Sequence, residues 1–440
     1  MNDLLTKLLR ALDAGTARRA LLEQYYAGTQ PLAFLSPEAR TAIGNRFARI
    51  AVNVCRLTVT ALTERLRVTG FAGATPALWT DWIGCNLDQL AGVAHREALT
   101  LGESYVIVWA NKAGDPLVTV ESATQVAVLR DPATREVVAA VKKWETESST
   151  EVTVFEPERI TRLTSSALGA TTGFRTLATI RNPFGLVPVV PLRNADRLLG
   201  PAASELDDLV PLVDALNKTL ADMLVSSEYA GRPRRWATGV ELKEEPAVDP
   251  NTGTPTGETT LVNPYPEGSR MMLHENPETK FGQLPAADLA GYEAAVRVIV
   301  SQIMAVSALP AHYVGVLANQ PASADALRAA EASLTARAEA RQAAFGTAWE
   351  RVAQLMVATR TGVDPLTVTV RVQWADASTR SIAQEADAVT KLHAAGLLPA
   401  SYALKRLGYD EDDIEAIRIA READSPAEPS NNQPTASGIR

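Results

Sequence analysis

Apolar residues recur at three- and four-residue steps along much of this chain, a period that predicts amphipathic helices. The spacing predicts one helix from Ser204 to about Tyr229 and another from Ala286 to Ala305. Pro211 predicts either a kink in the first of these or a helix that starts near that proline. The longest predicted helix begins at Ser323, its expected N-cap, and continues to Arg360 without a proline.

This last helix is unusually long for a chain of this kind. At 1.5 Å per residue it would span about 50 Å, more than a small domain needs to cover its core. Gly346 lies in its middle and costs about 1 kcal/mol relative to alanine, so it is predicted to mark a bend. The pattern predicts a protein organised around long helices.

The period becomes alternating in the first half of the chain. Valine-rich segments separated by turns predict a β-meander over 104–163. Pro183, Pro188 and Pro191 predict an extended connector after it, because proline withholds its N–H and favours an extended predecessor. Residues 1–102, which precede the meander, read as helices.

Further strands are predicted in a small unit at 231–284. Its strands are expected near 235–241 and 270–274, on either side of a loop at 245–258 that is rich in proline, threonine and glycine. One more strand is predicted at 365–374. Helices and strands are therefore both abundant, and the predicted fold class is α+β.

Two other segments differ from these elements. Residues 307–321 are too rich in proline and asparagine for a helix and too apolar for a flexible linker. Residues 376–424 predict three short helices, and the polar stretch 425–440 is predicted to be a disordered tail.

Composition excludes several classes of protein. Hydrophobic residues make up 46% of the chain and charged residues 21%, as in ordinary globular proteins. The formal net charge is −8, whereas a protein that binds DNA through its phosphates is usually basic. No apolar run approaches the ~18 residues of a membrane span, and the N-terminus lacks a signal-peptide core. Cys55 and Cys85 are expected to be free buried thiols in a reducing compartment.

Enzyme motifs are missing from the sequence. It contains no phosphate-binding GxxxxGK[ST] loop, no GxGxxG, no HExxH and no GxSxG. Its histidines are scattered singly, and the acidic run at 410–413 is explained best by favourable placement at a helix N-terminus. No catalytic, cofactor-binding or metal site is predicted, and the chain is not expected to be an enzyme.

One cluster has the composition of a binding site. Arg232, Arg234 and Arg235 stand beside Trp236, a combination found on nucleic-acid-binding surfaces and also at protein interfaces. Docking to a protein is favoured over DNA contact, and both remain open. The helices of 376–424 imitate a helix-turn-helix, but their six basic and ten acidic residues argue against entry into a DNA groove.

Six segments in order give the chain a family resemblance. They are YYAGTQPLAFL, HREALTLGESYVIVW, NPFGLVPVVPL, DALNKTLADMLVSSEYAGRPRRWATGVE, SADALRAAEASL and ADAVTKLHAAGLLPASYALKRLGY. Together they resemble the portal protein of tailed double-stranded DNA bacteriophages, of the siphovirus type that infects actinobacteria. The resemblance implies a homo-oligomeric ring of twelve copies at one capsid vertex, around a channel for genome packaging and ejection.

The resemblance also divides the chain into regions. It implies a wing (1–202, with the meander at 104–163), stem helices (203–230 and 285–306), a clip (231–284), a tunnel loop (307–322), a long helix with a wing strand (323–375), a crown (376–424) and a tail (425–440). The residues of the tunnel loop that it places nearest the DNA are His312, Tyr313, Val314, Asn319 and Gln320. It places the arginine–tryptophan cluster of residues 232–236 on the clip as a docking surface.

Partners and location follow from the same resemblance. The implied partners are the terminase large subunit, then the head–tail connector or adaptor, with the major capsid and scaffolding proteins and weakly held DNA without sequence preference. The protein would assemble in the bacterial cytoplasm and reside in the virion at the portal vertex, without a membrane. The alternatives are another head–tail connector or minor head protein and, less favoured, a phage nuclease or protease.

Overall fold

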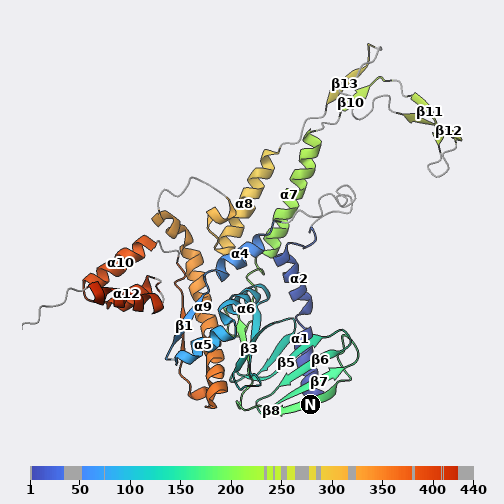
Figure 1. Cartoon of the computed structure of the whole chain (residues 1–440). Coiled ribbons are helices and arrows are strands. Elements are labelled where there is room, and N and C mark those ends of the chain that lie inside the picture. Colours follow the sequence, from blue (N-terminus) through green and yellow to red (C-terminus); the bar gives the residue numbers. More distant parts are fainter. Residues whose placement is uncertain are drawn as a thin grey trace, which may run out of the picture. The chain divides into compact units, whose positions relative to one another are not determined.

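The structure is a computed structural model of the whole chain (Figure 1). It describes residues 2–33, 52–73, 75–231, 235–240, 243–248, 255–262, 277–283, 289–315, 324–378, 382–407, 409 and 411–424. Two compact units are present, 1–377 and 378–440, and each is described by itself. Both helices and strands are abundant, as the sequence predicts.

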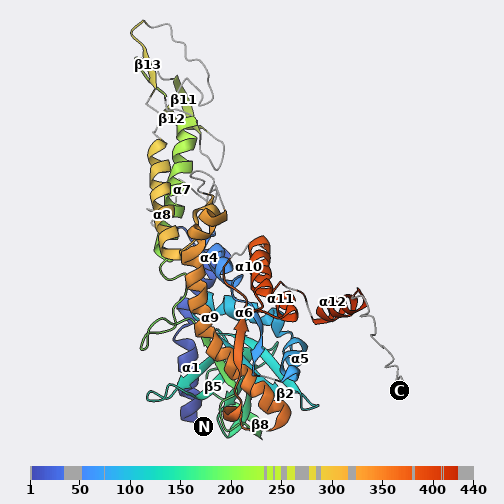
Figure 2. The same ribbon diagram turned by 90° about the vertical axis from the view of Figure 1, so that its left-hand side faces the viewer.

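The first unit contains the long helices. Its helical segments are α1 (Asn2–Asp13), α2 (Thr16–Ala27), α4 (Val54–Thr63), α5 (Pro76–Gly84), α6 (Leu87–Leu101), α7 (Val210–Gly231), α8 (Ala290–Ser307), α9 (Ala324–Thr361) and the 3-10 turns η1 (Ala311–Val314) and η2 (Pro365–Thr367). Helix α7 starts one residue before Pro211, which confirms the alternative of a helix that begins near this proline. Helices α7 and α8 lie side by side in both views (Figures 1 and 2) and are joined by a hydrogen bond between the hydroxyls of Ser226 and Tyr292.

The strands form several separate sheets. They are β1 (Val68–Ala72), β2 (Glu103–Ala110), β3 (Pro116–Ser122), β4 (Val126–Arg130), β5 (Val137–Glu145), β6 (Thr150–Phe155), β7 (Arg159–Ser165), β8 (Arg175–Arg181), β9 (Val189–Arg193), β10 (Arg235–Thr238), β11 (Lys243–Val248), β12 (Pro255–Val262), β13 (Lys280–Gln283) and β14 (Arg371–Trp374). The two larger sheets have the orders β3-β2-β9 and β4-β5-β6-β7-β8, and β1-β14, β10-β13 and β11-β12 are two-stranded.

The strands predicted as one meander belong to two sheets. Strands β4 to β8 form a true antiparallel meander, whereas β2 and β3 pair with each other and β2 also pairs with the distant β9. Val106 lies opposite Val190 in this pairing. Strand β9 contains Pro191, in the stretch predicted to be an extended connector; because β9 is an edge strand, the missing N–H is tolerated there.

Three local predictions need correction. Residues 1–102 are not helical throughout, because Val68–Ala72 forms β1, which pairs with β14. Part of the loop predicted at 245–258 is extended, because β11 and β12 pair as an antiparallel ribbon in which Lys243 faces Val262. Both strands of a two-stranded ribbon are edges, so the prolines within them are tolerated. The strand predicted at 365–374 is shortened to β14, because Asp364 accepts a hydrogen bond from the Leu366 N–H and starts η2.

The five-stranded sheet carries its own small core. Helix α1 covers it with leucines that recur at three- and four-residue steps, Leu5, Leu8, Leu9 and Leu12. These pack on Val141, Val152, Val154 and Leu163 of the sheet. The leucines, which lie on one face of the helix, and the valines, which lie on one face of the sheet, thus form one apolar layer.

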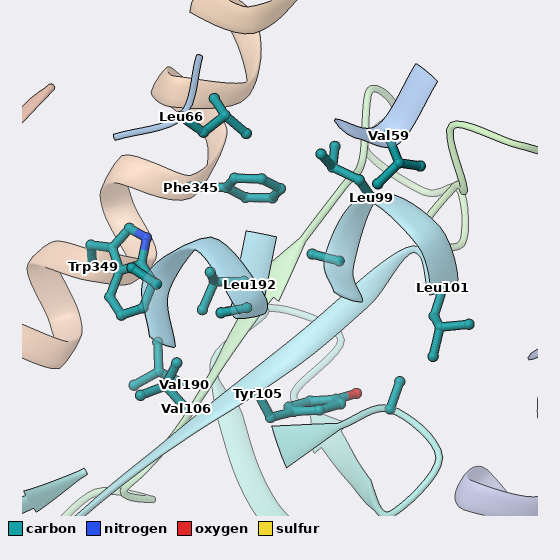
Figure 3. Close-up of a cluster of buried hydrophobic side chains, with 14 of the residues drawn as sticks. Val59, Leu66, Leu99, Leu101, Tyr105, Val106, Val190, Leu192, Phe345 and Trp349 are labelled. Carbon is teal, nitrogen blue, oxygen red and sulfur yellow. The ribbon is translucent and has the colours of Figure 1, made fainter. Parts of the chain in front are cut away.

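The larger core surrounds the three-stranded sheet. Helices α6 and α9 both pack on this sheet, and Phe345 and Trp349 of α9 lie among Val190, Leu192 and Val106 (Figure 3). All of these side chains are buried. The long helix is therefore held to the sheet by its C-terminal half.

Helix α9 runs from Ala324 to Thr361, which confirms the predicted long helix. Ser323, its predicted N-cap, lies outside the described residues. Gly346 is buried, and a Cβ atom there would lie 3.2 Å from Val372 Cγ1 and 3.5 Å from Trp374 Nε1 of β14. The glycine thus permits β14 to approach the helix closely, a reason for its presence that is separate from the predicted bend.

The second unit is small and helical. It contains α10 (Ile382–Ala394), α11 (Ala400–Arg406) and α12 (Glu411–Asp424), where the sequence predicts three short helices. Gly396 has a φ of 73°, the left-handed conformation that lets the chain leave α10. Val389 of α10 and Ala403 of α11 are both buried. The predicted tail, 425–440, lies outside the described residues.

Candidate functional site

The most informative polar site lies where the chain leaves α8 toward α9. Ala308 has a φ of 58°, which ends α8 in a left-handed residue, and Leu309 and Pro310 are buried immediately after it. The 3-10 turn η1 follows and ends at Gly315, whose φ is 73°. The beginning of the predicted tunnel loop is therefore folded onto the protein.

Four side chains from three segments meet at η1. Glu331 of α9 accepts a hydrogen bond from Arg65, with 2.9 Å between Arg65 Nη2 and Glu331 Oε2. His312 Nε2 lies 3.3 Å from the other carboxylate oxygen, Oε1. Arg65 Nη1 also donates to the hydroxyl of Tyr313 over 3.4 Å. We call Arg65, His312, Tyr313 and Glu331 the loop clamp.

The clamp is largely shielded from water. The side chains of Arg65 and Glu331 retain 9% and 10% of their exposure, and that of His312 retains 27%. The His312 and Tyr313 rings contact each other edge to face, with centroids 4.8 Å apart. Removing either member of a buried Arg–Glu pair of this kind is strongly destabilising, because the remaining charge loses a close partner of opposite sign.

A second ion cluster joins α9 to the segment that leads from β9 into α7 and to the end of α8. Arg341 donates through Nε to Glu205 Oε1 over 2.8 Å and also pairs with Asp196. Arg337 Nη1 lies 3.5 Å from Glu205 Oε2, while its Nη2 donates to the carbonyl of Val306 over 3.0 Å. Arg337 and Arg341 are one helical turn apart, so they face the same direction.

Charge pairing in this second cluster changes the proton affinity of its members. The hydrogen bond from Arg341 holds the pKa of the Asp196 carboxyl below its usual range, against the opposing effect of burial. Burial favours the neutral form of Arg341, yet the adjoining carboxylates Asp196 and Glu205 raise its pKa overall. The ion pair between Arg341 and Asp196 is therefore charged near neutral pH, and the junction of α7, α8 and α9 is held by ionic contacts.

The predicted docking cluster lies only partly within the described residues. Arg232 and Arg234 fall outside them. Arg235 belongs to β10, and only its backbone is among the described parts of the chain. Trp236 is 44% exposed and crosses Gly282 of β13, where a Cβ atom would come within 2.4 Å of the indole. Phe281 of β13 is also exposed. The β10–β13 ribbon thus presents aromatic surface to solvent.

The predicted tunnel-loop residues divide in the same way. His312, Tyr313 and Val314 form part of η1, and the first two belong to the loop clamp. Asn319 and Gln320 fall outside the described residues. Sequence reasoning did not find Arg65 and Glu331, which are 266 positions apart. No local pattern links two residues so distant, so only the tertiary structure reveals their pairing.

Other candidate chemistry is limited. Burial raises the pKa of the Cys55 thiol to about 12, while Cys85 is partly exposed and its Sγ donates to the carbonyl of Pro116. Both cysteines are free, as predicted, but only Cys55 is fully buried. Within the described ranges, no three His, Cys, Asp or Glu side chains gather as metal ligands would. Among the helices of those ranges, none is long and apolar enough to cross a membrane.

Comparisons with known proteins point to one family. Residues 38–428 match the model of the family described as phage portal protein, SPP1 Gp6-like. The portal protein of Mycobacterium phage D29 is 32% identical over 394 residues, which cover 82% of this chain and 77% of that protein. The portal protein of Mycobacterium phage L5 is 30% identical over 387 residues, again covering 82% and 77%.

Solved structures with a similar chain come from gene transfer agent particles. A chain of the native virion superimposes with a TM-score of 0.46 at 14% identity, covering 90% of this chain and 99% of that one. A chain of the native neck, determined with C12 symmetry, gives a TM-score of 0.45 at 13% identity, covering 91% and 99%.

Proposed function

Because this chain belongs to the SPP1 Gp6-like family of phage portal proteins, we propose that twelve copies form a ring-shaped channel at one capsid vertex. The genome would enter through this channel during packaging and leave through it during ejection. The observation that carries the proposal is the family match over 38–428, which includes both long stem-like helices, η1 and all of α9. In this role the protein resides in the virion and acts as a structural component.

Electron microscopy of the purified protein tests this proposal. We expect rings with a central hole, and symmetry analysis of the class averages should give twelvefold rotation. Native mass spectrometry of the same sample gives the copy number independently, which separates a ring from an irregular aggregate. A protein that stays monomeric, or forms closed particles without a hole, would argue for the connector or minor head protein alternative.

The same proposal divides the chain into the regions that the family resemblance implies. Assignment of 1–202 to the wing is supported by its two packed sheets, and assignment of 203–230 and 285–306 to the stem by the pairing of α7 with α8. Assignment of 231–284 to the clip is supported by its two small ribbons. Assignment of 376–424 to the crown is supported by the three helices of the second unit.

The channel itself would be lined in part by the tunnel loop, 307–322. Support comes from its position between α8 and α9, where it starts with the short turn η1. His312, Tyr313 and Val314 lie at its root, and the loop would reach the DNA with Asn319 and Gln320. With a net charge of −8 per chain, contact with DNA would be weak and without sequence preference.

The clip would contact protein partners. Exposed Trp236 and Phe281 on the β10–β13 ribbon support this proposal, since aromatic side chains are enriched at protein interfaces. The terminase large subunit would dock first and the head–tail connector afterwards, with Arg232, Arg234 and Arg235 supplying positive charge. Capsid and scaffolding proteins would contact the ring elsewhere.

A further inference from the structure

We infer that Glu331 is a positioning residue for the tunnel loop, because its carboxylate holds η1 through His312 and the end of α4 through Arg65. This inference rests on the proposed function of the loop as part of the channel. It adds one specific point, which is that the loop clamp attaches the start of the loop to α9 and to the end of the α4 segment.

Each oxygen of the Glu331 carboxylate has a separate task. Oε2 accepts from Arg65, which follows α4, while Oε1 faces His312 of η1 at 3.3 Å. Arg65 reaches the same turn a second time through the Tyr313 hydroxyl. One buried carboxylate therefore connects three segments that are far apart in sequence: α4, η1 and α9.

The backbone before the clamp restricts the loop further. Ser307 Oγ donates to the carbonyl of Ile303 at 2.7 Å and accepts from the Leu309 N–H at 3.3 Å, which fixes the last turn of α8. The buried Leu309 anchors the chain, and the Tyr313 N–H donates to the carbonyl of Pro310 over 3.0 Å. With the backbone fixed at 307–310 and the side chains fixed at 312–313, the clamp determines where residue 315 lies.

The polar contacts of the clamp fix the orientation of η1, which an apolar contact would not do. An apolar contact would fill the same volume without directional preference, whereas the Glu331 carboxylate accepts the Arg65 hydrogen bond from a particular direction and faces His312 Nε2 with its other oxygen. Loss of the Glu331 charge would take a close ionic partner from the poorly hydrated Arg65 guanidinium. Loss of His312 would weaken only the attachment of η1 to α9. The two substitutions should therefore differ in their consequences.

Hydrogen exchange tests the clamp on the purified full-length protein. The amides of Tyr313 and Gly315 donate within η1, to Pro310 and Ala311, so they report on its order. In His312→Ala we expect these amides to exchange at least tenfold faster with an unchanged melting temperature, since Arg65 and Glu331 remain paired. In Glu331→Gln we expect the same local effect together with a lower melting temperature.

Two variants serve as matched controls. His312→Gln places an amide donor near the position of the imidazole Nε2, and it should restore most of the protection lost in His312→Ala. Glu293→Gln removes a carboxylate that pairs with Arg297 over 2.7 Å on the exposed side of α8, and it should leave exchange in η1 unchanged. Unchanged protection of Tyr313 and Gly315 in both His312→Ala and Glu331→Gln would overturn the inference.

Packaging assays then separate this inference from the proposed function. His312→Ala rings should assemble normally but package less DNA than wild type, and His312→Gln rings should recover. Absence of rings from the wild-type protein would reject the proposed function while leaving the exchange result to decide the clamp. Normal packaging by His312→Ala rings with an exposed η1 would show that the clamp does not position the loop for transport, and would overturn the inference.

Discussion

The indole N–H of Trp349 donates a hydrogen bond to Nε2 of His95, with 2.7 Å between the two nitrogens, inside the larger core. Phe345 stacks on the imidazole with centroids 5.4 Å apart, and Trp374 lies at 5.6 Å. Because Nε2 accepts a hydrogen bond, the neutral ring carries its proton on Nδ1. The contact joins α6 to α9 and makes the core sensitive to protonation.

Acidification should weaken the wild-type protein through His95. Burial lowers the pKa of this imidazole from 6.5 to about 3, so below pH 6.5 the unfolded chain binds a proton that the folded chain excludes. Stability present above pH 6.5 is therefore lost as the pH falls toward 3, by at most about 1.4 kcal/mol per unit. Thermal unfolding at pH 7 and pH 5 measures this loss.

The matched variant for this experiment is His95→Gln. Its amide oxygen can accept from Trp349 but does not titrate, so the difference in melting temperature between pH 7 and pH 5 should shrink. The other histidines are common to both proteins and cancel in the comparison. An equal pH dependence in the variant would show that His95 does not contribute to acid sensitivity.

Arg341→Met should destabilise the junction of α7, α8 and α9. The substitution leaves the buried carboxylate of Glu205 with weaker compensation, at a cost of about 3–5 kcal/mol in free energy of unfolding. The double variant Arg341→Met with Glu205→Leu should be less destabilised than the sum of the single variants. Chemical denaturation of all three gives this coupling, and simple additivity would mean that the two side chains act independently.

Gly346→Leu should be strongly destabilising even though leucine favours helices. Its Cβ would lie tightly against Val372 and in contact with Trp374, and the rest of the side chain would force β14 away from α9, at a cost of about 1–3 kcal/mol or more. Ala344→Leu, on the exposed side of the same helix, is the control and should be nearly neutral. Melting temperatures compare the two, and similar values would show that β14 can move without penalty.

The clip proposal predicts a separation of assembly from docking. Arg232→Glu together with Arg235→Glu should leave ring formation intact and reduce terminase-driven packaging or connector attachment, because partner contact would lose positive charge. Electron microscopy shows whether rings form, and a binding assay with purified terminase measures docking. If rings are lost instead, these arginines belong to contacts between subunits and the docking proposal is wrong.

Leu198 and Leu199 should contribute to ring assembly. They are 78% and 92% exposed, and they lie in the segment between β9 and α7. This segment is held in place by the ion pair between Asp196 and Arg341 and by a hydrogen bond from the Asn194 side chain to the carbonyl of Ala203. Changing both leucines to serine should reduce the fraction of rings, because their apolar surface would no longer be buried against a neighbouring copy.

The control for this change is Leu397→Ser, at an exposed position in the second unit. Native mass spectrometry at matched concentration gives the ring fraction of each variant, and melting temperatures show whether the fold is intact. An equal loss of rings in the control would mean that apolar surface matters without regard to position. No loss in the double variant would contradict the prediction.

Periodicity alone was sufficient to predict the helices and the fold class. The apolar stripes of α7, α8 and α9 repeat within each segment, so their existence and approximate ends follow from local sequence. The start of α7 beside Pro211 also follows from a local rule. Six ordered segments were enough to predict the family, since a family match depends on the residues and their order along the chain.

Only the tertiary structure decided how these elements pair. Strands β2 and β9 are separated by the whole five-stranded meander, so nothing local to β2 shows that Val190 is the partner of Val106. The loop clamp has the same origin, because Arg65 and Glu331 meet only after α4 and α9 have packed. Local sequence determines which conformation a segment prefers, whereas contacts between distant segments depend on the burial of the entire chain.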